Sequence, residues 1–134
     1  MMMSCDNNGD GMKQERFKLR LKLWIDADGE NAFGPGSAAL LKGVEETGSL
    51  AGAARALGMS YRAAWGRVRK IEARLGEAVL RKRGGNKAGY ELTARGHAML
   101  VAYEALFEEM DTLAQARFQE LFASPESAGR VRDE

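Results

Sequence analysis

The stretch that decides the fold is residues 49–65, Ser-Leu-Ala-Gly-Ala-Ala-Arg-Ala-Leu-Gly-Met-Ser-Tyr-Arg-Ala-Ala-Trp. Ser49 and Ser60 can each begin a helix, because a serine oxygen accepts from the free backbone N–H groups of a first helical turn. Gly58 suits the turn between these helices, and the small Ala54 allows them to cross closely. The first helix should bury a stripe of Leu50, Ala53, Ala54 and Leu57. The stretch therefore predicts a helix-turn-helix.

The second helix of this unit is predicted to run from Tyr61 to about Leu75 and to end at Gly76. Its inner face would hold Ala64, Val68, Ile71 and Leu75. Its outer face would hold Arg62, Ala63, Gly66, Arg67, Arg69 and Lys70. Arginines can reach phosphates or guanine edges, and small residues permit a close approach to a DNA groove. We predict a recognition helix, with Trp65 at the edge of the buried face, equally suited to core packing and to DNA contact.

A basic hairpin is predicted to follow. Residues 79–83 and 90–92 indicate two strands, and the glycine-rich turn between them carries further charge. Beside the recognition helix, such a wing can touch the DNA backbone or the minor groove. A nucleotide-binding loop is rejected, because the Gly-Lys-Ser/Thr ending is missing. The predicted DNA-binding residues are Ser60, Tyr61, Arg62, Ala63, Trp65, Gly66, Arg67, Lys70, Arg81, Lys82, Arg83, Asn86 and Lys87.

The part before the helix-turn-helix is predicted to hold a β-hairpin and one helix. Residues 17–25 alternate apolar and polar side chains, which indicates a strand with one buried face. Residues 26–29 form a hairpin-type turn, and residues 30–33 can return as a short strand. A helix is expected from near Ser37 to Gly48. It would bury Leu40, Leu41 and Val44.

A long helix is predicted from a cap at Thr93 to about Ala123, with apolar residues at three-to-four spacing. One domain of this size cannot cover a helix of about 30 residues, roughly 45 Å long, so part of the apolar stripe should pack on a second copy. The alternative is that the helix folds back onto its own core. The predicted dimer interface is Leu100, Tyr103, Leu106, Phe107, Met110, Leu113, Phe118 and Leu121. A dimer would present two recognition helices about 34 Å apart.

Charge is distributed unevenly along the 134 residues, although the total is only +1. Residues 1–59 hold seven basic and eight acidic side chains, residues 60–87 nine and two, and residues 88–134 four and nine, giving −1, +7 and −5. The basic middle segment indicates an anionic partner, most commonly a polyphosphate. No apolar run is long enough for a membrane helix and the start lacks a secretory pattern, so we expect no membrane partner and a cytoplasmic protein.

Residue types that carry catalysis or bind metals are sparse. Cys5 is the only cysteine, in a polar tail, and we expect an incidental thiol. His97, the only histidine, has no nucleophile or second histidine arranged nearby. Asp26, Asp28 and Glu30 lack the remaining ligands of a calcium loop. We therefore predict no enzyme, no catalytic residue, no cofactor and no metal.

The same residues carry a family resemblance. Residues 49–65 resemble the N-terminal domain of ModE-type molybdate-responsive regulators and, more broadly, LysR-type DNA-binding domains. Residues 71–76, the basic wing and residues 91–96 repeat the helix-wing-helix order of those families, so the resemblance spans about residues 17–123. It implies DNA binding and dimerisation through the last helix. Because the chain ends at Glu134, we expect a stand-alone DNA-binding module, whose control by molybdate would require either a separate molybdate-sensing protein or a pocket that the sequence does not reveal.

The predicted fold is mostly α with small β: a winged helix-turn-helix with an N-terminal β-hairpin and a long C-terminal dimerisation helix. We divide the chain into a disordered tail (1–15), the winged domain (16–92), the long helix (93–123) and a flexible tail (124–134). The predicted function is sequence-specific binding of double-stranded DNA by a dimeric transcriptional regulator, in molybdate or related metabolism. The alternative is a non-enzymatic protein-interaction module that uses the apolar last helix and contacts nucleic acid non-specifically.

Overall fold

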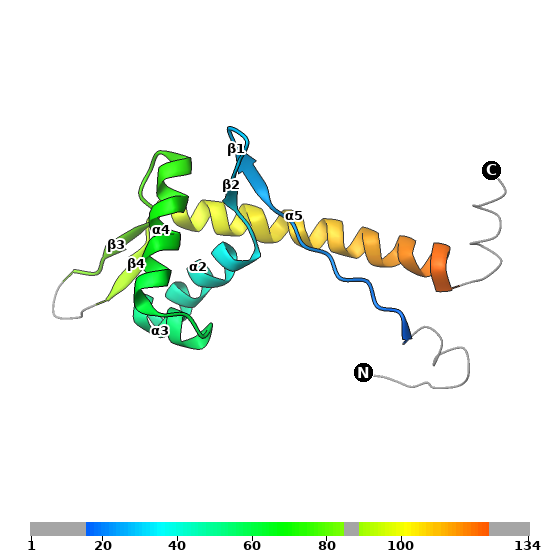
Figure 1. The fold of residues 1–134 in the computed structure, drawn as a ribbon, viewed down its shortest axis with the longest axis horizontal. Helices are drawn as coiled ribbons and strands as arrows, with labels where there is room; N and C mark the ends of the chain where they lie inside the picture. Colours follow the sequence, from blue (N-terminus) through cyan, green and yellow to red (C-terminus); the bar gives the residue numbers. More distant parts are fainter. Residues whose placement is uncertain (1–15, 85–88, 124–134) are drawn as a thin grey trace. The chain divides into compact units, whose positions relative to one another are not determined.

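The computed structural model describes residues 16–84 and 89–123, which are mostly helical with two short antiparallel hairpins (Figure 1). The elements are β1 (Ile25–Ala27), β2 (Glu30–Phe33), α2 (Pro35–Thr47), α3 (Leu50–Ala56), α4 (Tyr61–Leu75), β3 (Leu80–Lys82), β4 (Tyr90–Leu92), α5 (Ala94–Phe118) and the π-helical η1 (Gln119–Ala123). Two compact units are present: unit 1 comprises Met1–Leu21 with Glu108–Glu134, and unit 2 comprises Lys22–Phe107. Unit 2 holds a winged helix-turn-helix fold, as predicted.

The helix-turn-helix forms because the predicted cap and turn residues act as expected. Ser49 Oγ accepts from Gly52 N at 2.8 Å at the start of α3, and Ser60 Oγ accepts from Ala63 N at 3.0 Å at the start of α4. Gly58 takes a φ of +69°, in the left-handed region that favours glycine, and thereby turns the chain between α3 and α4. The predicted caps and turn are thus confirmed.

Small residues bring α2 and α3 close together in the core of unit 2. A Cβ on Gly43 would lie 2.8 Å from the Cβ of Ala53, so only glycine fits where the two helices meet. Leu50, Ala53 and Ala54 are buried as predicted. Leu57 is not: it is 42% exposed and lies just past the end of α3 at Ala56.

The strand predicted over residues 17–25 is wrong in its length. Exposure alternates from residue 19 to 25 as the pattern requires, but β1 covers only Ile25–Ala27. β1 is short because its partner strand, β2, is short. A two-residue turn at Asp28 (φ +54°) and Gly29 (φ +80°) leads into β2, which ends at Phe33 just before α2. Residues upstream of Ile25 therefore have no strand opposite them.

The first turns of α5 belong to the core of unit 2. Tyr103 packs edge-on against Phe33 with ring centroids 5.1 Å apart, and its hydroxyl donates to the Leu23 carbonyl at 2.9 Å. Burial raises the pKa of the Tyr103 phenol. Leu100 and Tyr103 are 1% and 5% exposed. Both were predicted in a dimer interface, but they are already covered by their own domain.

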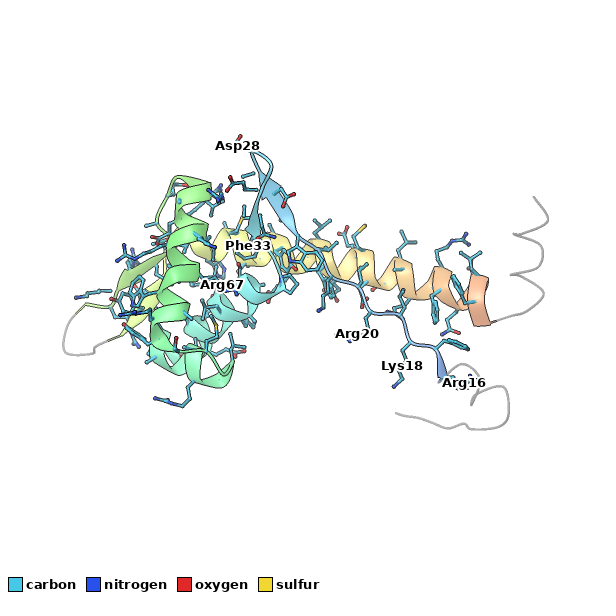
Figure 2. All side chains as sticks on the ribbon, in the orientation of Figure 1. Arg16, Lys18, Arg20, Asp28, Phe33 and Arg67 are labelled. Atoms are coloured by element: carbon cyan, nitrogen blue, oxygen red, sulfur yellow. The ribbon has the colours of Figure 1, made fainter. Side chains whose placement is uncertain are left out.

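The long helix begins as predicted, since Thr93 Oγ1 accepts from Gly96 N at 3.0 Å, and helical structure continues to Ala123, the last described residue. Within unit 1, the Gln115 side-chain amide donates to the Leu19 carbonyl at 3.1 Å, so the extended segment carrying Lys18 and Arg20 runs along this part of α5 (Figure 2). No helix within the described ranges has both the length and the apolar character needed to cross a membrane.

Candidate nucleic-acid interface

The outer face of α4 carries mainly short or cationic side chains, together with the aromatic Tyr61. Ala64, Val68 and Ile71 are buried and Leu75 is half-buried, which confirms the predicted inner face. The exposed residues include Tyr61, Arg62, Ala63, Gly66, Arg67, Arg69 and Lys70, with the cap residue Ser60 also exposed. A Cβ on Gly66 would meet no atom within 4 Å, so this glycine leaves open space on the helix surface. The face is therefore accessible to a partner that approaches the backbone.

Arg67 takes a different direction from the one predicted by the helical wheel. Although Arg67 is exposed, its guanidinium reaches the start of α2: a Cβ on Gly36 would lie 2.8 Å from Arg67 Nη1. Arg67 and Lys70 both line a groove beside α4. The Arg67 guanidinium thus reaches toward α2, whereas the sequence prediction had placed this side chain on the outer face of α4.

An aromatic cluster joins α4 to the wing. Trp65 packs edge-on against Tyr90 of β4 at 5.2 Å and against Tyr61 at 6.4 Å between ring centroids. The Arg69 guanidinium lies 5.8 Å from the centroid of the Trp65 ring. Trp65 is half-buried and packs against the core, so its position is explained by packing between α4 and β4. Such packing fixes the wing relative to α4.

Charges of the wing are partly engaged within the hairpin itself. Arg81 and Glu91 face each other across β3 and β4, with Arg81 Nε 2.7 Å from Glu91 Oε2. Arg83 lies close to the turn before α3, since a Cβ on Gly48 would be 2.6 Å from Arg83 Nη1. Lys82 is exposed. The predicted contacts Asn86 and Lys87 lie outside the described residues.

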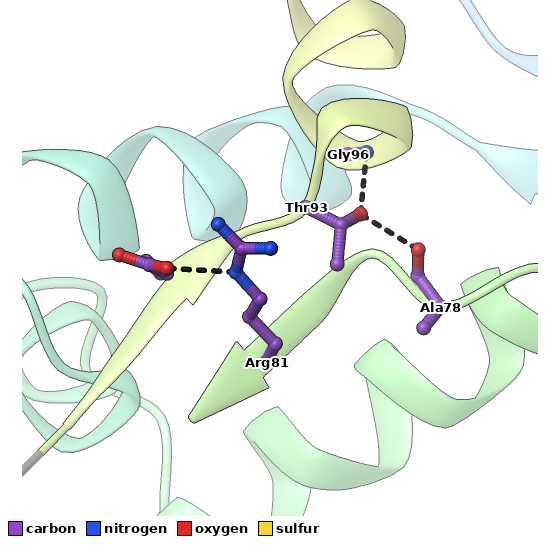
Figure 3. A network of polar contacts seen from close by, with 5 residues as sticks. Ala78, Arg81, Thr93 and Gly96 are labelled. Carbon is purple, nitrogen blue, oxygen red and sulfur yellow. Dashed lines mark hydrogen bonds and ion pairs between the residues drawn. The ribbon is translucent and has the colours of Figure 1, made fainter. Parts of the chain in front are cut away.

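Backbone contacts anchor the base of the wing. The Gly48 carbonyl accepts from Tyr90 N at 3.1 Å, and the Glu72 carboxylate accepts from Val79 N at 2.9 Å just before β3. Thr93 Oγ1 donates to the Ala78 carbonyl at 2.7 Å while it caps α5, as Figure 3 shows. The sequence prediction missed the anchoring role of Gly48 and Glu72. For Gly48, only the end of a helix was expected, because hydrogen bonds between distant segments leave no local pattern.

His97 is accounted for by an ion-pair geometry on the surface. Its Nδ1 lies 2.9 Å from Glu45 Oε2 of α2, and the two side chains are 60% and 37% exposed. The pair contributes to the junction between α2 and the start of α5.

Comparisons with known proteins identify the same segment. Residues 37–97, from α2 to the first turn of α5, match the family model described as bacterial regulatory helix-turn-helix protein, lysR family. The chain is also similar to a curated protein named molybdenum-pterin-binding protein MopB, of Rhodobacter capsulatus, with 40% identity over 70 residues. That similarity covers 51% of this chain and 26% of MopB, so the chain spans about a quarter of its relative's length. The family match supports DNA-binding transcription regulation, a class without enzymatic activity, for the winged helix-turn-helix segment.

Proposed function

We propose that the protein binds duplex DNA sequence-specifically as a dimer, with α4 in the major groove and the wing on the backbone or in the minor groove. The observation that carries the proposal is the exposed face of α4, where Arg62 lies beside the open surface at Gly66. Long cations read base edges or phosphates, and a missing side chain lets the helix approach the groove. The lysR-family match of residues 37–97 supports this use of α4.

Dimerisation is proposed through the apolar residues that α5 leaves exposed. Leu106, Met110 and Leu113 are 44%, 36% and 57% exposed and follow one another at helical spacing. Phe107, Phe118 and Leu121 are half-buried and remain in the proposed interface, whereas Leu100 and Tyr103 are left out of it because the core covers them. Exposed leucines at this spacing favour packing against another helix. A two-fold dimer would match a palindromic DNA site.

The same exposed leucines favour a second candidate, a protein-interaction module that holds a different partner. The two candidates differ in what the basic face does. If the exposed face of α4 reads DNA, the logarithm of the association constant for duplex DNA falls with the logarithm of salt concentration, by about 0.9 per neutralised phosphate. The affinity for a specific site is then also higher than the affinity for random duplex. A module with non-specific contacts shows no preference for any sequence.

The test combines selection of a DNA consensus from random duplexes with the double variant Arg62→Ala and Arg67→Ala. We expect the wild-type chain to select a palindrome, and the double variant to lose specific binding while remaining a dimer. Arg16→Ala with Arg20→Ala is the matched control, because it removes two exposed arginines of unit 1 and should leave specific binding unchanged. Unchanged binding by the double variant would rule out the α4 proposal.

A role in molybdenum-related regulation is also proposed, on the similarity of 70 residues to the molybdenum-pterin-binding protein. The DNA-binding segment would act with a separate molybdate-sensing protein. Calorimetric titration of the purified chain with molybdate and with tungstate tests this arrangement. We expect no heat of binding, and tight binding would show that the chain itself is the sensor.

A further inference from the structure

A groove of about 560 Å³ runs along one side of α4, between this helix, β2 and the start of α2. Its lining includes Asn31, Ser37, Ala63, Gly66, Arg67 and Lys70. Figure 2 labels Arg67 on the side of α4 that lies toward α2. The wing packs on the other side of α4 through Trp65, so the groove is a separate feature of the same helix.

The start of α2 places positive charge in this groove. Its N-cap is Gly34, which provides no side-chain bond, and no acidic residue occupies the first turn. Ala38 N bonds back to the Gly34 carbonyl, which leaves the N–H groups of Gly36 and Ser37 as the free donors of the helix end. The Arg67 guanidinium lies against Gly36, at the positive end of the helix dipole. The Arg67 guanidinium and the positive end of α2 repel each other, and an anion bound between them would offset this repulsion.

Ser37 gives a second and independent indication of a ligand. The residue is only 4% exposed and lines the groove, yet within residues 16–84 and 89–123 its hydroxyl has no hydrogen-bond partner. A buried hydroxyl without a hydrogen-bond partner destabilises the folded state. A ligand oxygen in the groove would satisfy it.

Within the described residues, no acidic side chain neutralises the positive charges of Arg67 and Lys70 in the groove. Glu30 lines the groove, but its carboxylate pairs with Arg74. Arg67 and Lys70 have no carboxylate within ion-pair distance in the part of the chain that the structure describes, namely residues 16–84 and 89–123. The groove therefore presents two cations that no described carboxylate pairs with, two backbone donors and one hydroxyl.

We propose that this groove binds a phosphate-type oxyanion, held by Arg67 and Lys70, the Ser37 hydroxyl and the backbone N–H groups of Gly36 and Ser37. The anion that the proposed function supplies is a backbone phosphate of the DNA beside the major groove, and the inference rests on that function for its source. A free inorganic oxyanion has the same chemistry. Arg67 thus positions the duplex rather than reading a base.

The test uses a variant that moves Arg67 without changing charge. In Gly36→Ala the new Cβ would lie 2.8 Å from Nη1, so the guanidinium must leave the start of α2, while alanine suits a helix. We expect Gly36→Ala and Arg67→Ala each to weaken duplex binding about tenfold, as for loss of a charge-assisted hydrogen bond, with no further loss when they are combined. Thermal unfolding of each variant shows that the fold is kept.

The source of the oxyanion is decided by titrating the free chain with inorganic phosphate and following the amide signals of Gly36 and Ser37 by NMR. Saturable shifts that Arg67→Ala abolishes support the site with a free oxyanion. Absence of shifts together with the non-additive loss of duplex affinity supports the site with a DNA phosphate.

Two outcomes separate this inference from the proposed function. If Arg62→Ala weakens duplex binding while Gly36→Ala and Arg67→Ala do not, and phosphate shifts no amide, the groove proposal is overturned and the DNA-binding proposal stands. If the folded wild-type chain binds no duplex, the proposed function fails. The phosphate titration alone then decides the groove: shifts support it, and their absence overturns it.

Discussion

Helix α4 and the later part of α5 both expose one face, but the chemistry of the two faces is opposite. On α4, Ala64, Val68 and Ile71 are buried, and apart from Tyr61 most exposed residues are charged or small, such as Arg62 and Gly66. On α5, Leu106 and Leu113 are exposed. An exposed arginine is well solvated, so burying it in an interface is favourable only when an anion pairs with it. Burying an exposed leucine stabilises an interface by about 1.5–3 kcal/mol. The first face therefore indicates a nucleic-acid partner, and the second indicates a protein surface.

Replacing the most exposed leucine of α5 is the strongest way to break this comparison. In Leu113→Asp both copies of a dimer would lose an apolar contact and gain a buried charge. The dissociation constant of the dimer should rise at least about 100-fold, since two leucines account for about 3–6 kcal/mol. Sedimentation velocity at micromolar concentration measures it. Thr112→Asp, a change at the neighbouring exposed residue, is the control and should remain dimeric. A monomeric wild-type chain would contradict the dimer proposal.

Filling the open surface on α4 should separate stability from binding. Gly66→Ala adds a methyl group where no atom lies within 4 Å, so it should stabilise the fold by up to about 1 kcal/mol through helix propensity. The same methyl group would meet DNA, and we expect duplex affinity to fall about tenfold, at the lower end of what a lost groove contact costs. Thermal unfolding and a binding titration of one sample give both values. Higher stability with unchanged affinity would mean that DNA does not approach this part of α4.

The sequence predicted local structure well, because local structure depends on residues that are close in the chain. The caps Ser49, Ser60 and Thr93 and the turn at Gly58 each act within four residues, and all four were found as expected. The mostly α fold with two small hairpins followed from these signals. The error in the strand at residues 17–25 has the same origin: alternation reports one buried face, but a strand also needs a partner, which alternation does not supply.

Contacts between segments that are distant in the chain could not be predicted from the sequence. Nothing local indicates that Tyr103 reaches the Leu23 carbonyl, so the apolar spacing of α5 placed core and exposed residues in one predicted interface. The groove beside α4 was missed for a similar reason. Ser37 and Arg67 are thirty residues apart, and Ser37 was considered only as a helix start. The predicted DNA contacts of α4 and the wing remain predictions.

Tyr103 tests whether the first turns of α5 serve the fold rather than assembly. Tyr103→Phe keeps the ring beside Phe33 but removes the hydroxyl that donates to the Leu23 carbonyl, so unfolding should become about 1 kcal/mol easier while the oligomeric state stays unchanged. Because burial raises the pKa of Tyr103, its protonated form favours folding. That contribution is complete below the ordinary value of 10.0 and is lost as pH rises through the raised pKa. Urea unfolding of both proteins across this alkaline range should show the wild-type chain losing its advantage.

Removing the acidic partner of Arg81 should have the smallest effect and should sharpen the electrostatic side of the comparison. Arg81 and Glu91 are 64% and 44% exposed, and an exposed ion pair of this kind contributes about 0–1 kcal/mol. Glu91→Gln frees the Arg81 guanidinium to contact a phosphate, so duplex affinity should rise up to about fivefold. The slope of the logarithm of the association constant against the logarithm of salt concentration should steepen by up to about 0.9.

Glu108→Gln is the matched control for Glu91→Gln, because it makes the same change of charge on an exposed residue of α5 in unit 1. If both variants raise affinity equally, the gain comes from net charge alone. A fall in affinity in Glu91→Gln would have another meaning: the pair holds β3 and β4 in the shape that the wing needs, and this would outweigh the charge it masks. The expected order, with Glu91→Gln above Glu108→Gln and both above the wild-type chain, places the wing on the DNA-facing side together with α4.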